Sequence, residues 1–260
     1  MNLTMKIFHT KIGDHFIQFE NAPEYINGMF RELEDASYRP DLTVTIQMDF
    51  GSPFVNYDVK EDRQADRIYF RRSDYLVEVD AEYQYAEISA YNELALKHAL
   101  INLYSSFIVF HKWGLLLHSS CVIENGKAHI FAGHSGAGKS TAAKLSYPRN
   151  LLSDEATILK ISSEKMEVYN SPFRSEILAA GEEEIFPLGS IQFLHQSLQN
   201  QREILTKSDS LISLITKVFY WSDHPANKKV ILGMLTELVN QVPIYNLFFQ
   251  KNDTFWELIS

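Results

Sequence analysis

The chain has 260 residues, of which 45% are hydrophobic and 22% charged, with a formal net charge of −9. This length supports one large domain or two modest ones, and the composition is that of an ordinary globular protein. Proteins that hold nucleic acid through phosphate contacts normally carry a basic surplus, so the acidic balance excludes that class but permits a local positive pocket. No segment approaches the roughly 20 apolar residues of a membrane span.

The single cysteine, Cys121, cannot form an intramolecular disulfide, which suits a reducing compartment. It lies in an apolar segment, and we interpret it as a packed strand residue and not as a reactive thiol. The N-terminal residues lead into no apolar run of the signal-peptide kind. We therefore expect a cytoplasmic protein that contacts neither a membrane nor nucleic acid.

Residues 1–92 predict a β-rich N-terminal domain. Alternating, β-branched and aromatic residues predict strands at 6–9, 16–19, 42–48, 67–70, 75–80 and 85–90. A helix is predicted over residues 23–34. The aromatic-rich strands suit a packing layer, but they also suit the binding of an extended peptide by strand addition, and the sequence leaves both open.

Residues 93–260 predict a second domain, which begins with helical spacing up to residue 112. Strands at 115–123 and 128–132 are joined by Asn125-Gly126, a pair typical of a two-residue hairpin turn. A glycine-rich loop and a short helix, 140–145, follow. The later elements are expected to be strands at 150–153, 157–161, 166–169, 190–194 and 242–249, and helices at 208–219 and 227–239.

The loop matches the pattern G-x-x-x-x-G-K-[ST] at every fixed position. Its glycines let the backbone curl so that N–H groups point at phosphate oxygens, Lys139 supplies a point charge, and the Ser140 hydroxyl can bind Mg²⁺. An apolar strand before it and helix-forming residues after it strengthen the match. We expect ATP to be bound by Gly133, His134, Ser135, Gly136, Ala137, Gly138, Lys139, Ser140 and Thr141.

The acidic pair Asp154-Glu155 ends a short strand one helix after the loop. A carboxylate there can hold the metal or accept a proton from an attacking hydroxyl, although adjacent acids at a strand end also occur as solvated turn residues. The short spacing favours a compact phosphotransferase over a motor protein. His118 ends the apolar run 114–117, where a histidine is more often structural than catalytic; no histidine shows metal-ligand spacing.

Three segments in this order resemble the HPr kinase/phosphorylase family: Leu117-His118-Ser119-Ser120, the loop 133–140, and the run 151–155 that ends in Asp154-Glu155. The resemblance is closer to the small HPr kinase-like proteins of peptide-modification clusters, such as lasso-peptide precursor kinases. Segments 170–176, 187–188 and 191–194 are also similar to these smaller members. His134 and Glu155 depart from the usual HPr kinase residues, so we expect an acceptor other than HPr.

The resemblance implies an α+β fold: a P-loop core of the HPr kinase/phosphoenolpyruvate carboxykinase kind with a mixed β-sheet, preceded by a smaller β-rich N-terminal domain. It also implies a Mg²⁺- and ATP-dependent kinase. Asp154 would be the base, Lys139 would stabilise the transferred phosphoryl group, and Ser140 and Glu155 would hold Mg²⁺. His118 would orient phosphate or base, and Arg174 would clamp the transferred group or the acceptor.

The expected acceptor is a serine or threonine hydroxyl of a peptide or protein, including a modified-peptide precursor. Two alternatives remain: an ATP-binding sensor or scaffold without transfer chemistry, and a kinase for a small metabolite. Because acceptor pockets depend on loop shape, the sequence does not separate peptide from metabolite. The oligomeric state also stays open.

Overall fold

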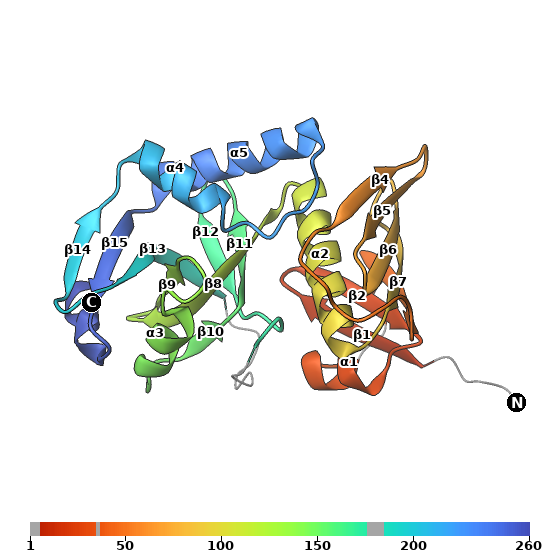
Figure 1. Cartoon of the computed structure of the whole chain (residues 1–260), viewed down its shortest axis with the longest axis horizontal. Helices are drawn as coiled ribbons and strands as arrows, with labels where there is room; N and C mark the ends of the chain where they lie inside the picture. The colour runs from red at the N-terminus through yellow and green to blue at the C-terminus, as the bar shows by residue number, and fades with distance from the viewer. Residues whose placement is uncertain (1–5, 35–36, 176–184) are drawn as a thin grey trace, which may run out of the picture. The chain divides into compact units, whose positions relative to one another are not determined.

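The computed structural model describes residues 6–34, 37–175 and 185–260. The chain forms two units: the first is Met1–Phe110 with Tyr220–Asp223, and the second is His111–Phe219 with His224–Ser260 (Figure 1). No helix of the described residues is long and apolar enough to cross a membrane.

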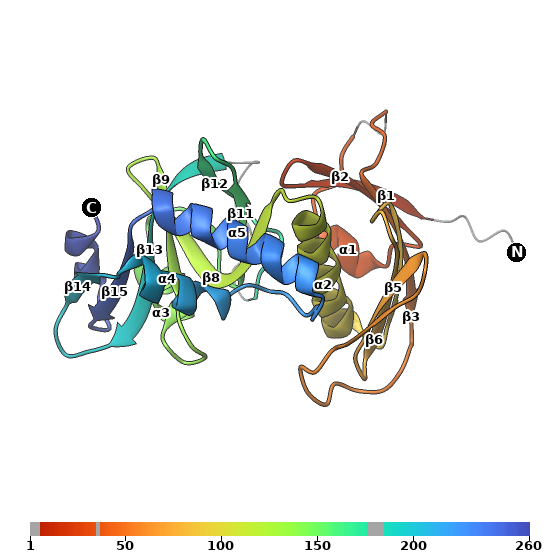
Figure 2. The ribbon, with the colours of Figure 1, turned by 90° about the horizontal axis from the view of Figure 1, so that it is seen from above.

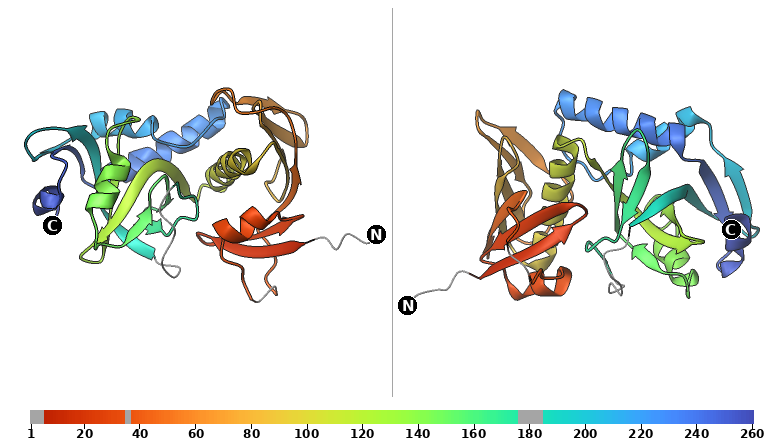
Figure 3. Two further views of the ribbon diagram at one scale, coloured as in Figure 1. Left: turned by 60° about the horizontal axis from the view of Figure 1, so that its bottom comes forward. Right: turned by 180° about the vertical axis from the view of Figure 1, so that it is seen from behind.

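A seven-stranded sheet forms the first unit, in the order β1-β2-β3-β7-β6-β5-β4. Its strands are β1 (Ile7–Ile12), β2 (His15–Glu20), β3 (Leu42–Met48), β4 (Lys60–Arg63), β5 (Arg67–Arg71), β6 (Tyr75–Asp80) and β7 (Tyr85–Ala90). Two helices belong to it, α1 (Glu24–Met29) and α2 (Glu93–Phe110). Helix α2 packs against β6 and β7, and Figure 3 shows it lying along the sheet. Burial alternates along β1 and β7, as expected where one face of a sheet is covered.

A buried ion pair lies in the turn between β5 and β6. The guanidinium of Arg72 donates to both carboxylate oxygens of Asp74 at 2.6 and 2.9 Å, and it donates to His98 Nδ1 at 2.8 Å. Both charged side chains are at most 3% exposed. The rings of Phe54 and Tyr75 lie 4.9 and 4.5 Å from the guanidinium carbon. The first unit thus surrounds a buried cation with its own counter-ion and aromatic faces.

The second unit is built on strands β8 to β15. They are β8 (Gly114–Glu124), β9 (Lys127–Ala132), β10 (Leu151–Ser153), β11 (Ala156–Ile161), β12 (Met166–Tyr169), β13 (Ile185–Gln196), β14 (Gln201–Ile204) and β15 (Ile244–Phe249). Its helices are α3 (Lys139–Leu145), α4 (Lys207–Ile215), α5 (Pro225–Gln241) and the 3₁₀ helix η1 (Asp253–Leu258). Figure 2 shows α5 running alongside β8 and β11, which it contacts.

Five of these strands close into a barrel. Strand β8 pairs with β11, β11 with β12, β12 with β13, β13 with β9, and β9 again with β8. Closure depends on two long strands that change partners along their length. The first half of β8 pairs with β11 and its second half with β9, while β13 pairs first with β12 and then with β9. Strands β15 and β14 extend the sheet beyond the barrel.

The predicted fold class is therefore wrong. The second unit is not an HPr kinase/phosphoenolpyruvate carboxykinase-like core on a mixed sheet, because its central strands form a closed ring. The N-terminal unit is smaller than the second and is rich in strands, with a seven-stranded sheet and the 18-residue helix α2. The chain is a mostly β protein with mixed α and β elements. Partner exchange by long strands leaves no mark on hydrophobic alternation, which explains the error.

Candidate functional site

The glycine-rich loop connects β9 to α3 and rests on an apolar core. Ala137 and Ala142, from the loop and from α3, pack in one buried cluster with Phe249, Phe255 and Trp256. The indole N–H of Trp256 donates to Ser146 Oγ, just beyond α3, at 3.0 Å. Residues of β15 and of η1 therefore pack against the loop and α3, and this packing supports the loop backbone.

Gly138 has a conformation that the sequence pattern requires. Its φ is +106°, in the region that side chains rarely adopt, and a Cβ there would lie 2.8 Å from Cζ of Phe249. Gly136 has a φ of +81° and faces open space. Its carbonyl accepts a hydrogen bond at 2.8 Å from Nε2 of Gln196, at the end of β13. The loop is thus curled by left-handed glycines and tied to its neighbouring strand.

The glycine-rich loop, His118 and the acidic turn lie at one edge of the second unit. Strands β9, β13 and β15 are parallel neighbours, so their carboxyl ends meet there. Strand β8 runs antiparallel to β9 and brings Ser119 opposite Ala132, the last residue before the loop. Ala156 of β11 pairs with His118, which brings the preceding acidic turn to the same edge. Along this edge the order is acidic turn, His118, glycine-rich loop, and the ends of β13 and β15.

Lys139 and His118 are brought into one electrostatic environment. Burial, and then the charges of Lys139 and Lys217, lower the pKa of His118 to about 4, so its ring is neutral at pH 7. Burial, and then Lys217, also lower the pKa of Lys139. The Lys139 ammonium donates to the carbonyl oxygens of His134 at 3.2 Å and Gly133 at 3.4 Å. Among the charged groups, Lys217 has the largest effect on the pKa of Lys139.

Lys217 was not predicted from the sequence. It follows α4, and its carbonyl accepts a 2.7 Å hydrogen bond from the backbone N–H of His118. The next residue, Val218, bridges to Leu117. This segment thus runs along the edge of β8 and brings a second lysine towards the loop. A lone lysine after a helix belongs to no motif, so only the backbone pairing reveals it.

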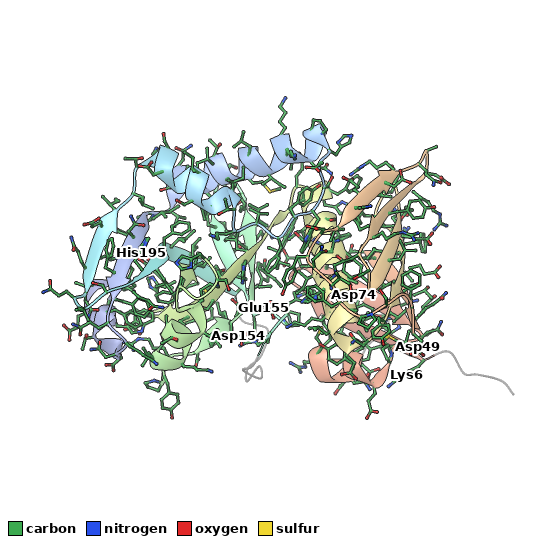
Figure 4. The ribbon with its side chains drawn as sticks, viewed as in Figure 1. Lys6, Asp49, Asp74, Asp154, Glu155 and His195 are labelled. Atoms are coloured by element: carbon green, nitrogen blue, oxygen red, sulfur yellow. The ribbon has the colours of Figure 1, made fainter. Side chains whose placement is uncertain are left out.

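The acidic turn, labelled in Figure 4, connects β10 to β11. Asp154 is 4% exposed, and its carboxylate oxygens accept hydrogen bonds from the backbone N–H and the Oγ of Ser175 at 3.0 and 2.9 Å. Glu155 is half-buried, and its carbonyl accepts from the backbone N–H of Ser119 at 3.1 Å. These bonds fix the turn beside β8 and hold the Asp154 carboxylate against Ser175.

A buried hydroxyl cluster beneath this turn also went unpredicted. Ser119 Oγ donates to Thr157 Oγ1 at 2.8 Å, and Ser153 Oγ bonds to the same oxygen. All three residues are fully buried. Since Ser153 and Thr157 flank the acidic pair and Ser119 follows His118, the cluster joins the two segments. Serine and threonine in strands carry no sequence signal for such a contact.

Arg174 lies apart from the loop in its contacts. Its guanidinium Nη2 donates to the carbonyl oxygens of Leu151 and Leu152, both at 3.0 Å, and to Asn170 Oδ1 at 2.6 Å. Its Nε donates to Ser171 O at 3.1 Å. These bonds hold β10 in place. Burial lowers the pKa of Arg174 and the charge of Asp154 opposes that shift, so Arg174 lies near the acidic turn.

The residues expected to hold Mg²⁺ fit that ion in donor type. Ser140 offers a hydroxyl and Glu155 a carboxylate, and both are the hard oxygen ligands that Mg²⁺ takes. Among the described residues no group of three or more histidine, cysteine, aspartate or glutamate side chains could form a metal cage. A site of one or two carboxylates completed by substrate phosphates needs no such cage.

Cys121, expected to be a packed residue, is buried on β8, where it pairs with Ile130. Burial raises the pKa of its thiol far above the usual range, which makes it unreactive.

One family model matches the chain, over residues 87–260, and it describes the SynChlorMet cassette protein ScmC. The match includes the loop, His118, Lys217 and the acidic turn, whereas residues 1–86 lie outside it. The chain belongs to this family. No curated protein matches the sequence.

Proposed function

We propose that this member of the ScmC family is an ATP- and Mg²⁺-dependent kinase that phosphorylates a serine or threonine hydroxyl of a peptide or protein. The order of its motifs is similar to that of HPr kinases and of the small HPr kinase-like proteins of peptide-modification clusters. The proposal rests on the residues of the loop and its surroundings and not on the fold. It assumes that the protein acts in the cytoplasm.

The observation that carries the proposal is the environment of Lys139. This half-buried lysine donates to backbone carbonyls, and its pKa is lowered by burial and by Lys217. A desolvated cation near a second cation is stabilised by an incoming anion. The curled loop around it supplies backbone N–H groups. A polyphosphate is the ligand that best satisfies both features.

The acidic turn supports transfer and not only binding. In the proposed step the acceptor oxygen forms a bond to the γ-phosphorus, the bond from that phosphorus to the β–γ bridging oxygen breaks, and ADP leaves. The acceptor proton passes to the carboxylate of Asp154 and then to solvent. Lys139 balances charge on the transferred group, and neutral His118 accepts or donates one hydrogen bond. Bound Mg²⁺, held by Ser140 and Glu155, would supply further charge neutralisation.

Binding of Mg–ATP to the full chain, measured by calorimetry, tests the loop. The variant Lys139→Ala should lose about 2 kcal/mol, or roughly thirty-fold in affinity, because a charged hydrogen-bond donor is removed. Lys144→Ala is the matched control, since that lysine is exposed on the same helix α3. Equal ATP affinity of Lys139→Ala and wild type would disprove the loop's assignment.

Transfer is tested by incubating the protein with Mg–ATP and candidate precursor peptides, and by following the peptide's phosphate mass increment. Asp154→Asn should abolish the increment while ATP binding persists. A variant that transfers phosphate as well as wild type would show that Asp154 is not the base. Tight ATP binding without transfer to any acceptor would favour a sensor or scaffold. Turnover with small molecules but not with peptides would favour a metabolite kinase.

A further inference from the structure

A cavity of about 470 Å³ opens beside the glycine-rich loop. It lies where β13 and β15 end and the chain turns towards β14 and η1. Its lining residues come from the loop, from α3 and from these two turns: Gly138, Thr141, Gln196, Ser197, Leu198, Phe249, Gln250 and Lys251. Its volume falls within the range of small-molecule sites, about 300–1,000 Å³.

The cavity shares a wall with the loop itself. Gly138 forms part of the lining and is also the last glycine of the loop before Lys139. Thr141, the residue after Ser140, lines it from the first turn of α3. A ligand with phosphates on the loop can therefore continue into the cavity without crossing the protein.

Hydrogen bonds make the far wall a preformed surface. The backbone N–H of Ser197 donates to the carbonyl of Phe249 at 3.0 Å, and the N–H of Gln250 donates to Asn200 Oδ1 at 2.8 Å. The side chain of Gln250 also donates to the carbonyl of Leu198. The turn after β13 is thus fastened to the turn after β15, and little ordering is left for a ligand to induce.

The lining suits a flat, partly apolar group. Leu198 contributes apolar surface and is 91% exposed, so its side chain is available to a ligand, whereas Phe249 is only 3% exposed and closes the base of the cavity. Thr141, Ser197 and Lys251 contribute hydroxyls and a positive charge. This mixture of apolar area and a few polar groups is typical of small-molecule and cofactor sites.

We infer that this cavity holds the nucleoside of the triphosphate whose phosphates lie on the loop; the inference rests on the proposed function. Along the edge of the unit, the cavity lies on the β13–β15 side of the loop, whereas His118 and the acidic turn lie on the β8–β11 side. The triphosphate then runs from the cavity across the loop, with its terminal phosphate towards Lys139 and Asp154. The same order leaves the β8–β11 side for the acceptor.

The test compares the affinities of Mg–ATP and Mg–tripolyphosphate, which share the phosphates but not the nucleoside. Wild type should bind Mg–ATP at least ten-fold more tightly than Mg–tripolyphosphate, as expected for burial of an apolar ring. Leu198→Ala should weaken Mg–ATP about five-fold through lost apolar contact and leave Mg–tripolyphosphate unchanged. Ile204→Ala is the control, because Ile204 is a comparably exposed aliphatic residue, on β14 outside the cavity.

Photolabelling provides a second measurement that needs no variant. With 8-azido-ATP, labelled peptides should contain residues 196–198 or 249–251. Labelling elsewhere overturns the inference, and so does equal affinity of wild type for Mg–ATP and Mg–tripolyphosphate. The proposed function still stands in either case if binding depends on Lys139. Failure of wild type to bind either polyphosphate overturns the proposed function itself. If Leu198→Ala instead raises the acceptor KM with ATP affinity unchanged, the cavity is an acceptor site and the inference is wrong.

Discussion

The two units each place a cation next to a histidine of low pKa, but they neutralise the cation differently. In the first unit Arg72 bonds to Asp74 and is covered by aromatic rings, and burial with the Arg72 charge lowers the pKa of His98 to about 4. In the second unit Lys139 donates to backbone carbonyls and is influenced most, among charges, by Lys217. In the described part of the chain Asp74 neutralises Arg72, whereas no carboxylate there bonds to Lys139, so an incoming ligand can supply the anion.

Breaking the ion pair between Arg72 and Asp74 should have the largest effect on stability. Arg72→Met leaves the Asp74 carboxylate buried without its partner, so we expect a loss of about 3–5 kcal/mol in the free energy of unfolding. Urea denaturation measures it. Arg71→Met, at the exposed neighbouring position, should change the free energy little. Recovery of stability when Asp74→Leu is added would confirm that the cost is the orphaned charge.

The loop's backbone provides the next effect. Gly138→Ala forces a side chain into a left-handed conformation and against Phe249, so it should cost about 2–3 kcal/mol of stability. Gly136→Ala has the same strain but open space around it, and should cost about 1 kcal/mol. Thermal unfolding of the two variants separates packing from conformation. Equal losses would mean that the ring of Phe249 moves aside.

The pH dependence of stability should sharpen the comparison of the histidines. The pKa of His118 is about 4 in the folded chain against 6.5 normally. The unfolded chain therefore binds the proton first, and stability is full above pH 6.5 and falls as the pH drops towards 4. His118→Gln should reduce the loss between pH 7 and pH 5 by about 2 kcal/mol. His134→Gln, in the exposed part of the loop, is the control; an unchanged slope in His118→Gln would contradict the assignment.

The smallest expected effect on stability concerns Lys139. Lys139→Met removes a desolvated charge that bonds to no carboxylate among the residues that the structure describes, so stability should change by less than about 1 kcal/mol, towards greater stability. Chemical denaturation without nucleotide measures it, with Lys144→Met as the control. A loss as large as that of Arg72→Met would show that Lys139 is a structural cation and would remove the contrast between the units.

Local structure was largely predictable, because hydrophobic periodicity and turn residues act at short range. The strands at 42–48, 75–80, 85–90 and 166–169 are confirmed residue for residue. Strands β4 and β14 were missed, since their sequences, KEDR and QREI, are polar edge strands without alternation. The helix predicted over 23–34 ends earlier, at Met29, just after Gly28.

The candidate site was predictable in its parts but not in its surroundings. The loop, His118 and the acidic pair follow a motif order that a single sequence displays. Lys217 is brought to the site by the pairing of residues 217–218 with β8. The cavity beside Phe249 follows from the pairing between β9, β13 and β15. The roles of the predicted residues in catalysis stay predictions until transfer is measured.

The pairing of β9 with β13 also has a kinetic consequence. Ile130 pairs with Ile191, so the contact that closes the barrel joins residues far apart in the chain. Contacts of high sequence separation form slowly, because the entropy of closing a long loop must be overcome first. The bond between Gln196 and Gly136 exists only once β13 has docked. The proposed nucleotide binding should therefore appear late in refolding, in step with barrel closure, and a fluorescent nucleotide would report that event.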